Sequence, residues 1–162
     1  MTAEALVAAL KDGGHTLAVA ESCTGGLLGG AITSVPGASQ VFIGGVIAYD
    51  DAVKTALLDV PADKIGRAGA VSASVAEAMA HGVRDRLHTD MAIAVTGVAG
   101  PSGGRSGKDV GTVWIAVLGP GHLLDVERFD LPGDRSSVRD AAVQHAITMA
   151  LDVLAEAKAE AQ

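Results

Sequence analysis

The sequence has 162 residues, a formal net charge of −7, 49% apolar residues and only 2% aromatic residues. This length fits a single domain over residues 1–162, whose core must be built from Ala, Val, Leu and Ile. The negative charge argues against a surface that binds nucleic acid or an anionic membrane non-specifically, and no apolar run approaches the ~20 residues of a membrane span.

The chain start and the cysteine usage indicate the compartment. The first residues lack a positively charged region followed by an apolar stretch, so no secretory signal is visible. The single cysteine, Cys23, rules out an internal disulfide and suits a reducing environment. We therefore expect a cytoplasmic protein in which Cys23 is a small buried side chain rather than a reactive thiol.

The first half of the chain alternates helices with short apolar strands. We expect these elements over residues 3–11 (helix), 16–20 (strand), 25–34 (helix), 41–49 (strand) and 51–57 (helix). Thr2 is the expected cap of the first helix, and the glycine pair after Asp12 ends it.

The second half begins and ends with a helix. We expect a helix to about residue 87, strands over 91–96, 111–118 and 122–131, and a final helix over 134–158. Ser74 and Glu77 form a capping-box pattern for the first of these helices, with Ser72 as a rival cap. The order of elements predicts the α/β class: a three-layer α/β/α single domain with a mixed, mostly parallel sheet.

The most informative stretch is Glu21-Ser22-Cys23-Thr24-Gly25-Gly26, where a predicted strand gives way to a helix. Such a turn is where an α/β sheet presents side chains and backbone amides to a ligand. Ser22 is a candidate nucleophile, and the two glycines let a substrate approach the backbone closely. The alternative is that Ser22 or Thr24 only caps the helix.

Tyr49 and Lys54 follow the second predicted strand, with Lys54 about one turn into the next helix. A lysine beside a serine can serve as a general base if desolvation or a nearby charge lowers its pKa. A tyrosine hydroxyl can relay a proton or hydrogen-bond a substrate. The alternative is that Tyr49 merely ends a strand and Lys54 is a solvated charge.

A glycine-rich loop over residues 97–110 follows the apolar strand 91–96. We expect Thr96, Gly97 and Gly100 to lie at a binding pocket, because the amides of such a loop can surround a carbonyl or phosphate oxygen.

Arg135 and Arg139 lie four residues apart at the start of the last helix, so they project from one face. A cation at a helix N-terminus opposes the helix dipole, and two forked guanidiniums suit a phosphate. A surface pair without a ligand is the alternative. The five histidines show no metal-ligand spacing, so we expect no metal site.

These segments, in this order, closely resemble the C-terminal domain family of the competence-damage-inducible protein CinA, which includes stand-alone nicotinamide-nucleotide amidases. The likeness covers nearly the whole chain. The matching segments are Ala20-Glu21-Ser22-Cys23-Thr24-Gly25-Gly26, Gly44-Gly45-Val46-Ile47-Ala48-Tyr49 with Lys54, Gly69-Ala70-Val71-Ser72, Ala94-Val95-Thr96-Gly97-Val98-Ala99-Gly100-Pro101, Val110-Gly111-Thr112-Val113-Trp114 and Pro132-Gly133-Asp134-Arg135.

The resemblance implies an α/β/α domain that hydrolyses the carboxamide of nicotinamide mononucleotide in pyridine-nucleotide salvage, giving nicotinate mononucleotide and ammonia without a cofactor. Ser22 would be the nucleophile, activated by Lys54 and Tyr49. Thr96 and the loop after it would line the pocket, and Arg135 would lie near the phosphate. Amides near Thr24 to Gly26 or in the glycine loop could stabilise the oxyanion.

The sequence also departs from the family pattern. Asp50-Asp51 replaces the Ser-Asn that many relatives carry after the tyrosine, and Asp50 could pair with Lys54 and raise its pKa, or face solvent. The loop over 102–109 differs in detail, and the additional N-terminal domain of larger members is not in this sequence, so we expect a stand-alone domain. A homo-oligomer, such as a dimer, is expected.

Two rival functions stay open. One is a non-catalytic module of the same fold that binds a nucleotide or a partner protein. The other is an amidase that acts on another phosphorylated amide.

Overall fold

The computed structural model describes residues 1–103 and 107–162, so part of the predicted glycine-rich loop lies outside the described residues. Its elements in chain order are α1 (Ala3–Gly13), β1 (Leu17–Glu21), α2 (Leu27–Thr33), the short 3₁₀ helix η1 (Ala38–Gln40), β2 (Phe42–Ile47), α3 (Asp51–Leu58), α4 (Ala62–Ala68), α5 (Ala73–Leu87), β3 (Met91–Gly97), β4 (Thr112–Leu118), β5 (Leu124–Asp130) and α6 (Arg135–Glu160).

The strands form one five-stranded sheet in the order β2-β1-β3-β4-β5. β1 pairs in parallel with β2 and with β3, whereas β4 is antiparallel to both of its neighbours. β4 therefore runs against the common direction of the other strands. The predicted mixed sheet, in which most strands point the same way, is confirmed.

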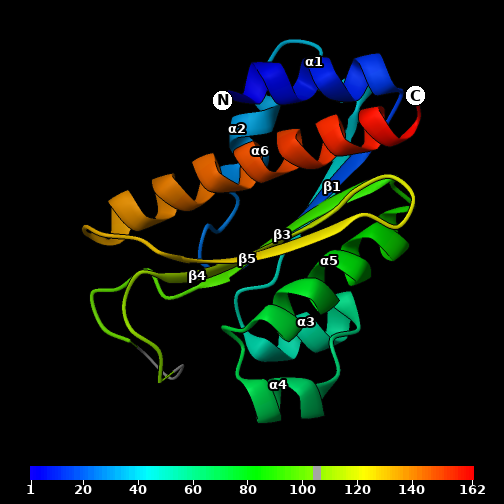
Figure 1. Ribbon diagram of the computed structural model, residues 1–162. Coiled ribbons are helices and arrows are strands. Elements are labelled where there is room, and N and C mark those ends of the chain that lie inside the picture. Colours follow the sequence, from blue (N-terminus) through cyan, green and yellow to red (C-terminus); the bar gives the residue numbers. More distant parts are fainter. Residues whose placement is uncertain (104–106) are drawn as a thin grey trace.

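Helices cover both faces of the sheet. Figure 1 shows α1, α2 and α6 on one face and α3, α4 and α5 on the other, which confirms the predicted three-layer architecture. α6 packs against β3, β4 and β5 as well as against α1 and α2, and α5 crosses every strand of the sheet from the opposite side. Both helical layers are needed because the central strands are apolar on each face.

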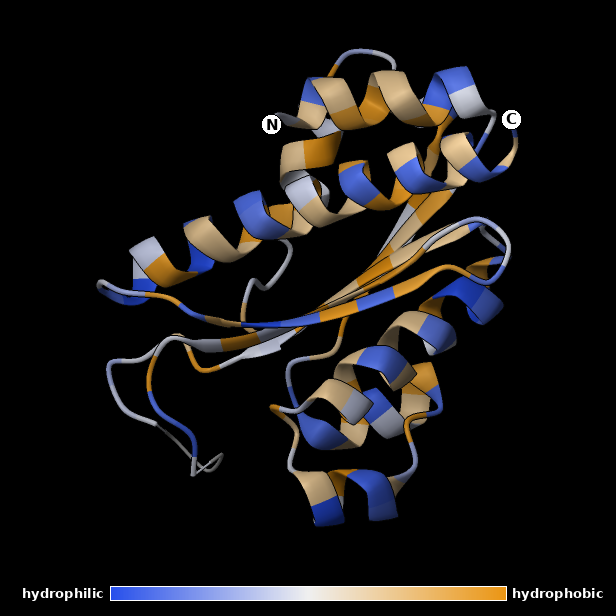
Figure 2. Ribbon diagram, viewed as in Figure 1, coloured by the Kyte–Doolittle hydropathy of each residue, from blue (hydrophilic) through white to orange (hydrophobic). Residues whose placement is uncertain are grey.

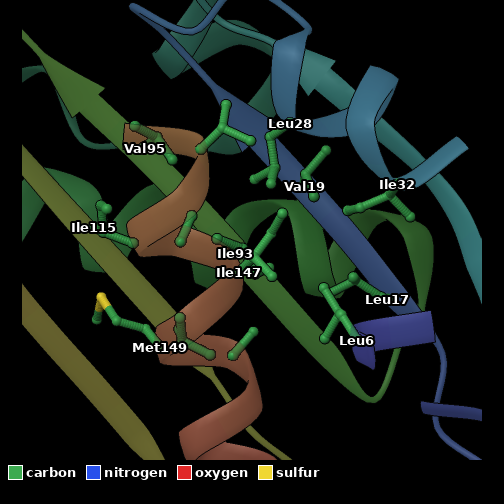
Figure 3. Packing of buried hydrophobic residues seen from close by; sticks show 14 of the residues in the cluster. Leu6, Leu17, Val19, Leu28, Ile32, Ile93, Val95, Ile115, Ile147 and Met149 are labelled. Atoms are coloured by element: carbon green, nitrogen blue, oxygen red, sulfur yellow. The ribbon is translucent and has the colours of Figure 1, made fainter. Parts of the chain in front are cut away.

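The core consists of two aliphatic clusters separated by the sheet. In the larger one, Leu28 of α2 and Ile147 of α6 lie over Val19 and Ile93 of the central strands (Figure 3). Figure 2 shows the central strands coloured hydrophobic while hydrophilic residues recur along the helices. Across residues 1–103 and 107–162, no helix combines the length and apolar character needed to cross a bilayer.

The structure corrects the sequence prediction at two places on the α3–α5 side. α4 was not predicted, because none of its residues is buried and it therefore carries no apolar periodicity. The Ser74–Glu77 capping box is wrong. Ser72 is extended, and its side chain accepts a hydrogen bond from the Val75 amide, so α5 begins at Ala73 and Ser74 lies inside its first turn.

The topology brings three strand ends to one edge of the sheet. The carboxyl ends of parallel strands β1, β2 and β3 point the same way, and the connections leaving β1 and β2 cross opposite faces of the sheet. Ligands of open α/β sheets bind outside the strand ends at such a switch in direction. Just beyond β1, the Ser22 amide donates to the Val95 carbonyl of β3 at 2.9 Å. Ser22 therefore stands at the switch point.

Candidate active site

A cleft of about 700 Å³ opens at this edge of the sheet. Its walls come from the turn after β1, the start of α3, the segment 65–71 around the end of α4, the loop after β3, and the first residue of α6. The expected site residues that line it are Ser22, Tyr49, Lys54, Thr96, Gly97, Gly100 and Arg135. The other four expected site residues do not line it: Thr24, Gly25, Gly26 and Arg139.

Ser22 and Lys54 meet on the floor of the cleft. Lys54 Nζ lies 3.2 Å from Ser22 Oγ, 2.9 Å from the Ala48 carbonyl oxygen and 3.1 Å from the Tyr49 carbonyl oxygen. The Lys54 side chain is only 1% exposed, although α3 lies on the outside of the domain. The alternative of a solvated Lys54 is therefore wrong.

Burial lowers the pKa of Lys54, because the charged ammonium loses hydration in this position. Asp51 opposes this shift from 3.7 Å, with its own side chain 60% exposed, and Asp50 opposes it more weakly. Asp50 forms no ion pair with Lys54: it is exposed, and its carboxylate caps α3 by accepting from the Ala52 amide at 2.8 Å. The direct carboxylate partner of Lys54 is Asp51.

Neither Ser22 nor Thr24 caps α2 with its side chain, so that interpretation is wrong. The carboxylate of Glu21, which is 2% exposed, accepts from the Leu28 amide at 2.8 Å and from the Gly29 amide at 3.0 Å. A buried carboxylate at a helix N-terminus is stabilised by these amides and by the helix dipole. The cap comes from the residue before Ser22, which leaves the Ser22 hydroxyl free to face Lys54.

Tyr49 and Arg135 interact at the rim of the cleft. One Arg135 nitrogen donates to the Gly100 carbonyl at 2.7 Å, and another donates to the Tyr49 hydroxyl at 3.0 Å. The Tyr49 side chain is 58% exposed. Its hydroxyl is thus brought to Arg135 rather than to Ser22, while its carbonyl contacts Lys54.

The end of β3 and the loop after it form another wall of the cleft. Thr96 Oγ1 donates to the Ala70 carbonyl at 2.9 Å, which ties the end of β3 to the segment after α4. Gly97 must lack a side chain here, because a Cβ would lie 2.7 Å from a Val113 methyl group and 2.9 Å from the Thr112 carbonyl. Thr96 therefore shapes the cleft, and Gly97 permits the close approach of β4.

Arg139 supports the turn that carries Ser22. Its Nε donates to the Cys23 carbonyl at 3.0 Å, and a terminal nitrogen donates to the Thr24 carbonyl at 3.1 Å. Gly25 and Gly26 lie in the same turn with φ values of 57° and 105°, which glycine adopts without strain. Cys23 is buried as expected, and burial raises the pKa of its thiol to about 11.

The sequence did not reveal several parts of this site. Glu21 was not recognised as a cap because it precedes the helix by several residues, outside the usual capping pattern. The segment around the end of α4, including Ile65 and Ala70, lines the cleft but carries no apolar period or reactive side chain that would mark it. The Gly69-Ala70-Val71 match to the family pattern was the one signal present.

The Thr24 hydroxyl provides a first test of the turn. Thr24 is fully buried, and Oγ1 has no hydrogen-bond partner among the described residues. A buried unpaired hydroxyl costs stability, so Thr24→Val is expected to raise the free energy of unfolding by about 1 kcal/mol. Denaturant unfolding measures this change.

The same variant separates a role of the Thr24 side chain from a role of its backbone. If Thr24 acts only through its backbone, Thr24→Val should keep kcat within about threefold of the wild-type value. A large loss of kcat in a variant that remains folded would show instead that the hydroxyl itself serves the substrate.

Comparisons with known proteins show the family of this chain. The family model described as the CinA C-terminal domain matches residues 1–154. The chain is 56% identical over 153 residues to a CinA-like protein of Parasynechococcus marenigrum, and 49% identical over 140 residues to one of Myxococcus xanthus. These matches cover 94% and 86% of this chain, but only 36% and 33% of the relatives.

Solved structures give the same result. A competence-damaged protein (CinA) superfamily protein from Klebsiella pneumoniae superposes with a TM-score of 0.91 at 33% identity, covering 95% of this chain and 96% of that one. The competence/damage inducible protein CihA from Agrobacterium tumefaciens gives 0.90 at 34% identity, covering 93% and 92%. The chain belongs to the CinA C-terminal domain family, and it spans about a third of the length of its curated relatives.

Proposed function

We propose that the chain hydrolyses the carboxamide of nicotinamide mononucleotide, giving nicotinate mononucleotide and ammonia. The observation that carries this proposal is the 3.2 Å contact between Ser22 Oγ and the buried Lys54 Nζ on the floor of the cleft. The choice of substrate rests on the resemblance to stand-alone nicotinamide-nucleotide amidases and on Arg135 at the cleft rim, where a phosphate would bind.

The contacts of Lys54 suit the neutral amine. A neutral lysine has two N–H bonds and one lone pair. In the neutral form, N–H bonds to the carbonyls of Ala48 and Tyr49 would leave the lone pair for the Ser22 hydroxyl, 3.2 Å away. In that state Ser22 donates its proton to Lys54 Nζ, which is the geometry that a general base requires.

The reaction follows from this contact. Ser22 Oγ attacks the carboxamide carbon while its proton passes to Lys54 Nζ, and a tetrahedral oxyanion forms. As the C–N bond breaks, the Lys54 ammonium returns a proton to the leaving nitrogen, and ammonia departs. A water molecule then attacks the acyl-enzyme with Lys54 again as base, which releases the carboxylate and restores the Ser22 hydroxyl.

Arg135 supplies the proposed phosphate contact. It projects from the first turn of α6 into the cleft, where its guanidinium already contacts Gly100 and Tyr49. Tyr49 in this scheme orients Arg135 and covers the bound nucleotide through its exposed ring, and its carbonyl holds Lys54.

Arg135→Ala should separate phosphate binding from chemistry. A charge-assisted contact contributes roughly 1.5–3 kcal/mol, so the variant should lower kcat/KM for the mononucleotide by about 10- to 100-fold. Nicotinamide riboside has the same amide and no phosphate, so its kcat/KM should change little. Arg128→Ala, on the outer strand β5, is the matched control. An equal loss with both substrates would show that Arg135 supports the catalytic centre rather than the phosphate.

A non-catalytic nucleotide-binding module is the principal rival. Such a module could use Arg135 and the glycine loop, but it has no need of a lysine amine buried against a serine. Ammonia release from the purified chain with nicotinamide mononucleotide tests the proposal directly. No ammonia, together with tight binding of the mononucleotide in calorimetry, would favour the module instead. A panel of other phosphorylated amides tests the substrate class.

A further inference from the structure

The turn that carries Ser22 is fixed from behind by Arg139. Its guanidinium reaches from α6 and donates to two consecutive carbonyls, those of Cys23 and Thr24. Arginine is suited to this task because its planar fork holds two acceptors in a fixed relation. Arg139 is therefore not free to meet a phosphate unless it abandons both contacts.

These contacts fix the direction of one amide. A trans peptide is planar, and its C=O and N–H bonds point opposite ways. The Cys23 carbonyl points to Arg139, so the Thr24 N–H of the same peptide points away from it. Among the described residues, the Thr24 amide forms no hydrogen bond. Cys23, which supplies the other half of this peptide, lines the cleft beside Ser22.

Four amides around Thr24 are already used. The Gly25 amide donates to the Ser22 carbonyl at 3.1 Å, and the Leu27 amide donates to the Thr24 carbonyl at 3.0 Å. The Leu28 and Gly29 amides donate to Glu21. Among the described residues, the amides of Cys23, Thr24 and Gly26 have no hydrogen-bond partner. Of these three, the Thr24 amide belongs to the peptide whose carbonyl Arg139 holds.

We propose that Arg139 is a positioning residue: it orients the Cys23–Thr24 peptide so that the Thr24 N–H donates to the oxyanion formed when Ser22 attacks. The inference deepens the proposed function and rests on it for the identity of the oxyanion. Arg139 touches no reacting atom in this scheme. It acts through the peptide plane, in contrast to Arg135, which meets the substrate itself.

Kinetics distinguish this role from phosphate binding. An oxyanion donor acts only in the transition state, so its misplacement lowers kcat and leaves KM nearly unchanged. Arg139→Ala should lower kcat by about 10- to 100-fold, by the same factor for nicotinamide mononucleotide and for the riboside. Arg139→Lys, which keeps the charge but not the fork, should fall between Arg139→Ala and wild type. A rise in KM confined to the mononucleotide would overturn the proposal in favour of a phosphate ligand.

A measurement without turnover makes the test independent of the substrate. In ¹H–¹⁵N spectra of the intact chain, Arg139→Ala should shift or broaden the Thr24 and Gly25 amide resonances, while the resonances of β3 and α5 stay in place. The Arg128→Ala spectrum is the control. Unchanged Thr24 and Gly25 resonances would overturn the role of Arg139, whatever the activity.

The failure of the proposed function would look different. The wild-type protein could release no ammonia from nicotinamide mononucleotide while Arg139→Ala still shifts the Thr24 amide resonance. In that case the substrate assignment would be wrong and the positioning role of Arg139 would stand. The rate at which a fluorophosphonate labels Ser22 then replaces kcat as the measure of oxyanion stabilisation. Phosphonylation also places negative charge on an oxygen bonded to the attacked atom. A labelling rate in Arg139→Ala equal to that of wild type would count against the proposal.

Discussion

Ser22→Ala is expected to lower kcat for ammonia release by about 10⁴-fold or more, the scale on which serine hydrolases respond to loss of the nucleophile. The substitution removes only Oγ, and the Ser22 amide keeps its hydrogen bond to the Val95 carbonyl, so the turn should stay in place. Thermal unfolding should therefore change little. Steady-state ammonia release at saturating nicotinamide mononucleotide measures the effect.

A matched serine gives the control for this experiment. Ser74 lies in the first turn of α5, outside the cleft lining, and Ser74→Ala should leave kcat unchanged. The scheme also uses no metal, so activity should persist after treatment with a chelator. Near-normal kcat in Ser22→Ala, or loss of wild-type activity with the chelator, would overturn the serine mechanism.

The adjacent cysteine does not offer an alternative nucleophile. A thiol reacts as the thiolate, and burial raises the pKa of Cys23 to about 11, so little thiolate exists near neutral pH. Its role in the turn is carried by the backbone, since its carbonyl accepts from Arg139 and its side chain joins the larger core cluster. The expectation of a buried, unreactive Cys23 is thus consistent with Ser22 as the attacking group.

The sequence predicted where the site lies because the relevant signals are local. A strand end followed by glycines, and a lysine about one turn into the helix after the next strand, can each be recognised within a few residues. Parallel pairing of β1, β2 and β3 then brings Ser22, Tyr49 and Thr96 to one edge of the sheet. The expectation that these residues share one site came from the family resemblance, and the parallel pairing is the physical reason that they meet.

The direction of individual side chains could not be predicted in the same way. Tyr49 and Lys54 lie on the same short segment, yet the Tyr49 hydroxyl turns outward to Arg135 while the Lys54 amine turns inward to Ser22. The four-residue spacing of Arg135 and Arg139 indicated one helix face, but Arg135 lines the cleft and Arg139 lies behind the turn. These choices depend on contacts between residues that lie 32, 86 and 116 positions apart in the sequence, which no local pattern contains.

Asp51 illustrates why a pair of acidic residues was hard to interpret. Either Asp50 or Asp51 could have approached Lys54, because both stand at the start of the same helix. The N-cap position decides between them: the carboxylate of Asp50 is occupied by the Ala52 amide, and Asp51, one residue into the helix, lies at (i, i+3) from Lys54. The capping of α3 by Asp50 therefore decides that Asp51 is the carboxylate that contacts Lys54 and raises its pKa.

Lys54→Met is expected to lower kcat by about 10²–10⁴-fold, the usual contribution of general acid–base catalysis. Methionine fills the space of the lysine stem and removes a buried amine, so the variant should remain folded when thermal unfolding is measured. Lys54→Arg keeps the positive charge but cannot lose a proton near neutral pH, and it should be nearly as impaired. If Lys54→Arg kept most of its kcat, Lys54 would be an electrostatic group rather than a base.

The dependence of kcat/KM on pH also tests whether Lys54 is the base. Asp51 takes no part in the proton transfers, so substituting it can shift the pKa of Lys54 without removing a reacting group. Lys54 must be neutral to accept the proton, so kcat/KM should rise with pH through the pKa of Lys54, which burial holds below its ordinary value. Asp51 stabilises the ammonium and raises that pKa, so Asp51→Asn should move the rising limb to lower pH. Asp50→Ser removes a more weakly coupled charge and keeps a capping side chain, so its shift should be smaller. A rising limb that does not move in Asp51→Asn would mean that another group, and not Lys54, takes the proton from Ser22.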